Sequence, residues 1–259
     1  MSSKRNRDRE DAGKSDRSYI KQNFLRSIVR SQANAYRWKH RGEQIVLIDG
    51  NAGDGEGVPL PQQDLFDDQV SSRPTPQIVT EVADEIGGAD VLLCECDKAK
   101  RQRLAERFPR AVCLKNNSDV VAHIRPEHRY ALWLSDPCGP RDHGVETMRL
   151  IVQRPGLRSD FVIAFNQGFI ERLEGTHHDD WEPSRCRYLP MGDLAWWAEQ
   201  LGKTRVARSR LIKQSNGFRF HVLIVANHLA DIARPPRFDE WFTAPPALRV
   251  VGGSEVHHG

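Results

Sequence analysis

The sequence lacks the long apolar runs that a membrane-spanning helix requires. Its longest apolar stretches, such as residues 45–48 and 222–226, have only a few residues, whereas a span needs about 20. The apolar core of a signal peptide is also missing, because the first 18 residues are polar and rich in Arg, Lys, Asp and Glu. These absences exclude a membrane-spanning protein and lead us to expect a soluble chain that acts in the cytoplasm.

Cysteine is also scarce. The 259 residues include five cysteines, an odd number, and no two of them form a Cys-x-x-Cys pair. This pattern argues against a disulfide framework and against a zinc knuckle, and it fits a reducing compartment. We therefore expect neither disulfides nor a metal site.

The net charge of +3 is unevenly spread along the chain. Up to Arg41 there are twelve basic and four acidic residues, a surplus of eight positive charges, so the remainder carries five more acids than bases. We expect residues 1–18 to form a basic flexible arm, residues 19–230 one domain, and residues 231–259 a C-terminal extension. The arm is suited to hold a polyanion, although a solvated tail would have the same composition.

Apolar residues alternate between helical and strand periods along most of the chain. Helices are expected at residues 19–38, 75–86, 98–108 and 144–153, and strands at residues 44–49, 90–95, 111–114, 130–134 and 161–165. Two further strand patterns, residues 205–212 and 218–226, flank an Asn-Gly turn that is typical of a hairpin. The sequence predicts an α/β fold with a mostly parallel sheet, covered on both faces and closed by an antiparallel C-terminal hairpin.

A glycine-rich segment follows the first predicted strand. It reads Asp49-Gly50-Asn51-Ala52-Gly53-Asp54-Gly55 and lies at the carboxyl end of the strand, where open α/β sheets bind ligands. Its glycine spacing departs from that of the dinucleotide motif. An acid at the strand end fits a ligand with an amino group better than one with phosphates. A glycine turn without a ligand is the structural alternative.

Acids also follow the later strands. Glu95 suits a ribose diol, whereas Asp97 is placed to cap the next helix. Asp119 is suited equally to meet an adenine edge or to cap a helix. Asp136, followed by the rigid Pro137, is a candidate hydrogen-bond acceptor or base near a reacting atom, unless it only caps a proline turn.

Basic residues cluster on the first strand of the predicted hairpin. They are Lys203, Arg205, Arg208, Arg210 and Lys213. Such a row is suited to nucleic-acid phosphates, but cations also protect an exposed sheet edge from aggregation.

Taken together, these motifs resemble the class I S-adenosylmethionine-dependent methyltransferase fold. More specifically, the chain is similar to the three-Cys-motif partner family, which carries that fold. The resemblance extends from about residue 19 to residue 228, and its motifs are residues 46–55, 92–97, 132–139, 164–166 and 220–228.

The resemblance implies a role for each motif. The first would line the methionine part of the cofactor through Asp49, Gly50, Asn51, Gly53 and Gly55. Glu95 would hold the ribose and Asp119 or its neighbours the adenine, while Asp136 and Pro137 would face the methyl group. The family name also implies a partner protein that bears a three-cysteine motif.

Three positions depart from the patterns of related enzymes. Asn51 stands where an aromatic residue is common in this loop, and Cys138 stands where base-modifying amino-methyltransferases have a second proline. Gly139 replaces the aromatic residue that would stack on a flipped base.

Two functions follow as expectations. The first is an S-adenosylmethionine-dependent methyltransferase that acts on nucleic acid. The second is a non-catalytic or degenerate cofactor-binding partner subunit of a larger, phage or defence-related, system.

Overall fold

A computed structural model describes most of the predicted domain. The described residues are 19–56, 73–137, 144–166, 194–203, 205–208, 212–213, 219–227 and 249–251. The predicted arm and most of the predicted C-terminal extension lie outside them, so both remain predictions. None of the described helices combines the length and apolar character needed to cross a membrane.

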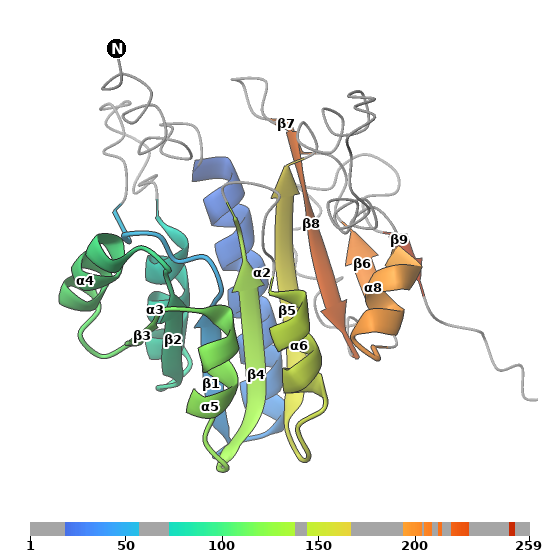
Figure 1. The fold of residues 1–259 in the computed structure, drawn as a ribbon. Coiled ribbons are helices and arrows are strands. Elements are labelled where there is room, and N and C mark those ends of the chain that lie inside the picture. Colours follow the sequence, from blue (N-terminus) through green and yellow to red (C-terminus); the bar gives the residue numbers. More distant parts are fainter. Residues whose placement is uncertain are drawn as a thin grey trace, which may run out of the picture.

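From α2 to α8 the described elements alternate between helical segments and strands, and four strands follow (Figure 1). The helices are α2 (Tyr19–Lys39), α3 (Thr75–Glu85), α4 (Lys98–Arg107), η1 (Asn117–Asp119), α5 (Val120–His123), α6 (Val145–Val152) and α8 (Leu194–Gln200). The strands are β1 (Gln44–Asp49), β2 (Asp90–Cys94), β3 (Val112–Leu114), β4 (His128–Ser135), β5 (Arg158–Asn166), β6 (Arg205–Arg208), β7 (Ile212–Lys213), β8 (Arg219–Ala226) and β9 (Arg249–Val251). Each predicted helix and strand is found, and β5 begins three residues earlier than predicted.

Among the described residues, nine strands form one sheet. Its order is β3-β2-β1-β4-β5-β8-β6-β9, with β7 also paired to β8. The first five strands pair in parallel, whereas β8 is antiparallel to both β5 and β6. The predicted hairpin is present, although its first strand is divided into β6 and β7, which both pair with β8. The predicted fold class is therefore confirmed.

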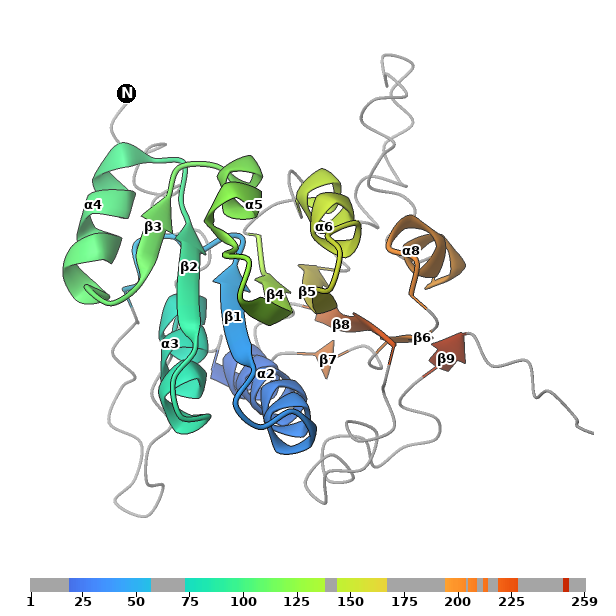
Figure 2. The ribbon, with the colours of Figure 1, turned by 90° about the horizontal axis from the view of Figure 1, so that it is seen from below.

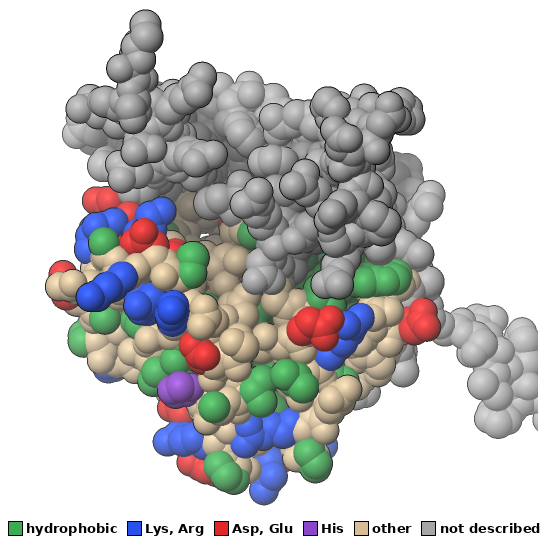
Figure 3. All heavy atoms as spheres, viewed as in Figure 1, with side chains coloured by type: hydrophobic (Ala, Val, Ile, Leu, Met, Phe, Trp, Pro, Cys, Tyr) green, Lys and Arg blue, Asp and Glu red, His purple; other side chains and the backbone are tan. Residues whose placement is uncertain are grey.

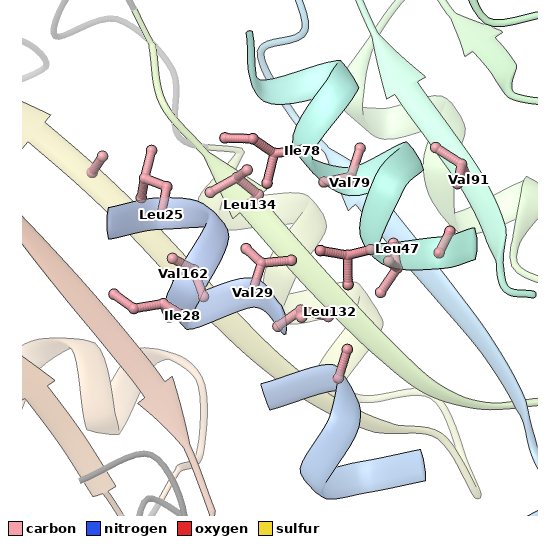
Figure 4. Close-up of a cluster of buried hydrophobic side chains, with 14 of the residues drawn as sticks. Leu25, Ile28, Val29, Leu47, Ile78, Val79, Val91, Leu132, Leu134 and Val162 are labelled. Atoms are coloured by element: carbon pink, nitrogen blue, oxygen red, sulfur yellow. The ribbon is translucent and has the colours of Figure 1, made fainter. Parts of the chain in front are cut away.

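Helices cover both faces of the sheet (Figure 2). Along β1, Ile45 and Leu47 point to the face covered by α2 and α3, and Val46 and Ile48 point to the face covered by α5, α6 and α8. Both faces of the strand are buried, which explains its continuous apolar run. Figure 4 shows the first core, where α2 and α3 pack on the central strands through Leu25, Ile28, Val29, Ile78, Val79, Leu47, Leu132, Leu134 and Val162.

The strand order reverses at β1. From this strand the chain first adds β2 and β3 on one side, and then returns to place β4 and β5 on the other. Ligands of open α/β sheets bind outside the carboxyl ends of the strands at such a reversal. The ends of β1, β2 and β4 are therefore the place where a functional site is expected.

Candidate functional site

Asp49 ends β1 at this reversal and is completely buried. Its Oδ1 accepts a hydrogen bond from the Asn51 backbone N–H at 2.9 Å, whereas Oδ2 is buried and is assigned no hydrogen-bond partner in the described part of the chain. Burial raises the pKa of Asp49 to about 7, and the charges of Asp136 and Glu95 add to this effect. The Thr75 side chain and the Asn51 amide act in the opposite direction. Oδ2 is thus placed to accept a hydrogen bond from a ligand.

Gly50 is required by packing. A Cβ atom at this position would lie 2.5 Å from Cζ2 of Trp133, whose ring lies beneath the turn. The Gly50 N–H donates to the carbonyl of Leu134 at 2.9 Å, and the Ala52 N–H donates to the carbonyl of Cys94 at 2.9 Å. The loop backbone is therefore fastened to β4 on one side and to β2 on the other.

The later glycines of the loop are required by backbone conformation. Gly53 and Gly55 have φ values of +64° and +68°, in the left-handed region that favours glycine. At Gly55 a side chain would also meet Phe108 and Leu104. The predicted glycine turn is confirmed, while its contact with a ligand stays a prediction.

The structure assigns different tasks to the two acids after β2. Asp97 caps α4, because its Oδ1 accepts from the Lys100 backbone N–H at 2.9 Å, and this hydrogen bond lowers the pKa of Asp97. Glu95 is half-buried, and its Oε1 accepts from the Asp97 N–H at 2.7 Å. Glu95 therefore remains the acid that faces the candidate site from β2.

Asp119 belongs to the cap of η1. Its Oδ2 accepts from the Asn116 backbone N–H at 3.1 Å, within a capping box at the start of η1. The neighbouring Asn117 has a buried side-chain oxygen for which no described residue is a hydrogen-bond partner. The predicted N-cap ahead of Val120 is not formed, because the Asp119 side chain makes no cap hydrogen bond to α5 and closes the preceding capping box instead. The predicted contact with adenine stays a prediction.

Asp136, directly after β4, forms an ion pair with Lys21 of α2. The Lys21 Nζ lies 2.9 Å from Oδ1 and 2.7 Å from Oδ2, and the two side chains are only 25% and 12% exposed, respectively. Sequence reasoning did not identify Lys21. A cation in the first turn of a helix, where the helix dipole disfavours positive charge, was the available signal.

Asn51 connects the glycine loop to the end of β4. The Ser135 hydroxyl donates to the Asn51 side-chain oxygen at 2.9 Å, and Ser135 is completely buried. Asn51 therefore has a structural partner at the position where related enzymes have an aromatic residue. Pro137 follows as a half-buried residue, and the departures at Cys138 and Gly139 lie outside the described residues.

Four buried polar atoms on elements at this edge have no hydrogen-bond partner among the described residues. They are Oε1 of Gln22, Oδ2 of Asp49, Oδ1 of Asn117 and Nε1 of Trp133. Buried polar groups in proteins are nearly always paired, with protein, water or a ligand. Three acceptors and one donor, together with the carboxylates of Asp136 and Glu95, favour a positively charged ligand that is rich in hydrogen-bond donors.

The predicted nucleic-acid residues are only partly described. Lys203 is buried, its Nζ lies 3.1 Å from the Ser159 Oγ and 5.7 Å from the centre of the Phe161 ring, and burial lowers its pKa. This placement does not fit the predicted phosphate contact, because the ammonium group is enclosed. The predicted phosphate contacts of the other four residues stay predictions. Only the backbone of Arg205, Arg208 and Lys213 is described, and Arg210 lies outside the described residues.

The candidate site contains no metal-binding cluster in the described part of the chain. No group of three or more His, Cys, Asp or Glu side chains is arranged there to hold an ion. The sequence His177-His178-Asp179-Asp180 lies outside the described residues.

Comparison with known proteins shows the fold. No family model and no curated protein matches the sequence. Among solved structures, the chain is similar to protein LPL1258 from Legionella pneumophila, with a TM-score of 0.52 and 12% identity over 89% of this chain and 96% of that chain. At such low identity this similarity concerns the fold alone.

More distant matches include S-adenosylmethionine-dependent methyltransferases. The O-methyltransferase TomG from Streptomyces achromogenes, solved with S-adenosylmethionine, has a TM-score of 0.45 and 13% identity over 84% of this chain and 90% of that chain. The plantazolicin methyltransferase BpumL, solved with S-adenosylhomocysteine, has a TM-score of 0.44 and 12% identity over 85% and 88%. The Rossmann-like fold predicted from the sequence is confirmed by the sheet itself, whereas the three-Cys-motif partner family is not shown.

Proposed function

We propose that the protein is an S-adenosylmethionine-dependent methyltransferase that acts on nucleic acid in the cytoplasm. The observation that carries the proposal is the buried, unpartnered Oδ2 of Asp49 at the reversal of the strand order, close to the charges of Asp136 and Glu95. S-adenosylmethionine bears an ammonium and a sulfonium group, so an acidic edge with free acceptors suits it. The similarity in fold between this protein and known methyltransferases supports the same assignment.

The residues at the edge fit the parts of this cofactor. Asp49 would accept from the ammonium group, and the backbone of Gly50, Asn51, Gly53 and Gly55 would follow the methionine part. Glu95 would accept from the ribose hydroxyls. The unpartnered oxygen of Asn117 is suited to the adenine amino group, with Asp119 holding the turn in which Asn117 lies.

When bound, the cofactor supplies an electrophilic methyl group, and the protein has to position the acceptor atom in line with it. Asp136 and Pro137 would face the acceptor. Because the Lys21 Nζ holds both oxygens of Asp136, at 2.9 and 2.7 Å, the carboxylate is fixed in place and is suited to accept a hydrogen bond from an N–H or O–H of the acceptor and orient it. Orientation is therefore its main task, ahead of proton removal.

Nucleic acid is proposed as the acceptor from the distribution of charge. The surplus of eight positive charges before residue 42 would attract a polyanion, and Arg205, Arg208, Arg210 and Lys213 add cations at the hairpin. The sequence motifs also support membership in the three-Cys-motif partner family and, with it, a partner protein that bears the three-cysteine motif.

A second candidate function is a partner subunit that binds the cofactor without transferring its methyl group. The Lys21–Asp136 ion pair favours it, because both oxygens of Asp136 already face an ammonium group. The replacements at Cys138 and Gly139 point in the same direction. Such a subunit would act through another protein of a larger, phage or defence-related, system.

Calorimetric titration with S-adenosylmethionine and S-adenosylhomocysteine tests the cofactor. Glu95→Ala should abolish binding, and Glu127→Ala, an exposed acid at the opposite end of the strands, should leave it unchanged. Failure of the folded wild-type protein to bind either compound would refute the proposal.

Transfer of a labelled methyl group to DNA and RNA tests the enzyme. Asp136→Ala should abolish transfer while cofactor binding persists. Cofactor binding without transfer to any nucleic acid would favour the partner-subunit function.

A further inference from the structure

Basic side chains gather over helix α4, at the β3 edge of the sheet (Figure 3). Five of its ten residues are Lys or Arg, and one, Glu106, is acidic. The helix begins three residues after Glu95, so its first turn lies at the edge that holds the candidate cofactor site. The acidic centre of the site is thus bordered by a basic helix.

The position of these cations within α4 works against helix stability. Lys98, Lys100 and Arg101 lie in the first turn, which has no acidic residue, although the positive end of the helix dipole favours acids there. Asp97 at the N-cap is a partial compensation. Residues that act against helix stability in this way are expected at functional positions.

The arginines of α4 are engaged within the protein. Arg101 Nη1 donates to the carbonyl oxygens of Glu95, at 2.8 Å, and of Cys96, at 3.2 Å. The other two face acids of the glycine loop, with Arg103 3.7 Å from Asp54 and Arg107 3.4 Å from Glu56. These contacts fasten α4 to the loop after β1, although Arg103 and Arg107 remain 48% and 42% exposed. Of the lysines of α4, Lys98 is exposed and Lys100 is half-buried.

Three lysines lie close to Glu95 in the sequence or on the neighbouring strand: Lys98 and Lys115, which are exposed, and Lys100, which is half-buried and whose charge acts on Asp97. The neighbour of Lys100 is Asp97, whose carboxylate already caps the helix. Lys115 follows β3, whose last residue, Leu114, accepts the Glu95 N–H at 3.0 Å. The three lysines therefore follow the carboxyl ends of two neighbouring strands, β2 and β3.

We propose that Lys98, Lys100 and Lys115 form a lysine rim that binds the phosphate backbone of a nucleic acid. This inference rests on the proposed function and assigns the surface that holds the nucleic acid beside the site. Lysine is a point charge on a flexible stem, which suits phosphate contacts without base readout. The rim would therefore add affinity without sequence specificity.

A nucleic acid fits this surface better than an acidic protein. Protein interfaces are depleted in Lys and contain aromatic or other large apolar anchors in their core. Among the described residues, the exposed large hydrophobic side chains are Trp38, Val112 and Leu150, and only Val112 belongs to an element beside α4. One valine is a poor anchor for a protein partner.

The test measures the anisotropy of labelled single-stranded DNA and RNA titrated with the full-length protein from about 50 to 200 mM salt. The rim variant carries Lys98→Gln, Lys100→Gln and Lys115→Gln. The matched control removes three exposed cations at the opposite end of the strands, through Arg110→Gln, Arg125→Gln and Arg129→Gln. Titration with polyglutamate is run in parallel.

We expect the rim variant to lose about a hundredfold in affinity at 0.1 M salt, with the salt slope reduced by about 2, because each phosphate contact to a single strand contributes about 0.7. The control should stay near wild type. Equal losses in both variants, no binding by the wild type, or rim-dependent binding of polyglutamate alone would overturn the proposal. Calorimetry with S-adenosylmethionine separates the outcomes, since retained cofactor binding means that only the rim has failed.

Discussion

Replacing Asp49 by Asn should stabilise the protein at neutral and alkaline pH. The pKa of Asp49 is about 7 in the folded chain and 3.8 in the unfolded chain. Between these values the folded state binds more protons than the unfolded state, so stability falls as pH rises from about 4 to about 7 and is constant above. The difference of about 3 pKa units corresponds to at most about 4 kcal/mol. Asn is neutral at every pH and avoids this loss.

Urea unfolding between about pH 5 and pH 8 measures the effect. The difference in unfolding free energy, variant minus wild type, should be small near pH 4 and grow to a few kcal/mol above pH 7. Asp84→Asn is the matched control, because Asp84 is an exposed aspartate on α3. A variant that is less stable than wild type at pH 8, or that keeps the wild-type pH dependence, would refute the reasoning.

The same carboxylate should make cofactor affinity depend on pH. An ammonium group favours ionised Asp49, so binding has to release the proton that Asp49 holds below pH 7. Wild-type affinity for S-adenosylmethionine should rise towards tenfold per pH unit from pH 5 and level off near pH 7, measured by calorimetry. Asp49→Asn should bind weakly and without this rise. A pH-independent wild-type affinity would contradict the predicted role of Asp49.

Three further substitutions test the packing of the site. Gly50→Ala should lower stability by a few kcal/mol and abolish cofactor binding, because its Cβ would overlap Trp133; an unchanged melting temperature would exclude this clash. Lys21→Met should cost about 3 kcal/mol by leaving Asp136 largely buried and unpaired, and Lys21→Arg should recover most of it in urea unfolding. Lys203→Met should leave nucleic-acid affinity unchanged in the anisotropy assay, because its ammonium group is enclosed.

Local sequence patterns were sufficient for the elements and for part of the site. The apolar run of residues 45–48 specified a strand buried on both faces, and the strand patterns before and after Asn216-Gly217 correctly predicted antiparallel strands. Asp97 is the predicted helix cap because capping depends on backbone groups within three residues. Patterns of this range are set by neighbours in the chain, and the sequence is enough to predict them.

Other features required the tertiary structure. Lys21 and Asp136 are separated by 115 positions, and only the packing of α2 beside β4 brings them together. The raised pKa of Asp49 depends on complete burial where β1 lies between β2 and β4. Likewise, Lys203 is buried where its Nζ contacts Ser159 of β5. Burial and long-range pairing are decided by which strands become neighbours, and the order of strands in a sheet is not encoded in the local period of apolar residues.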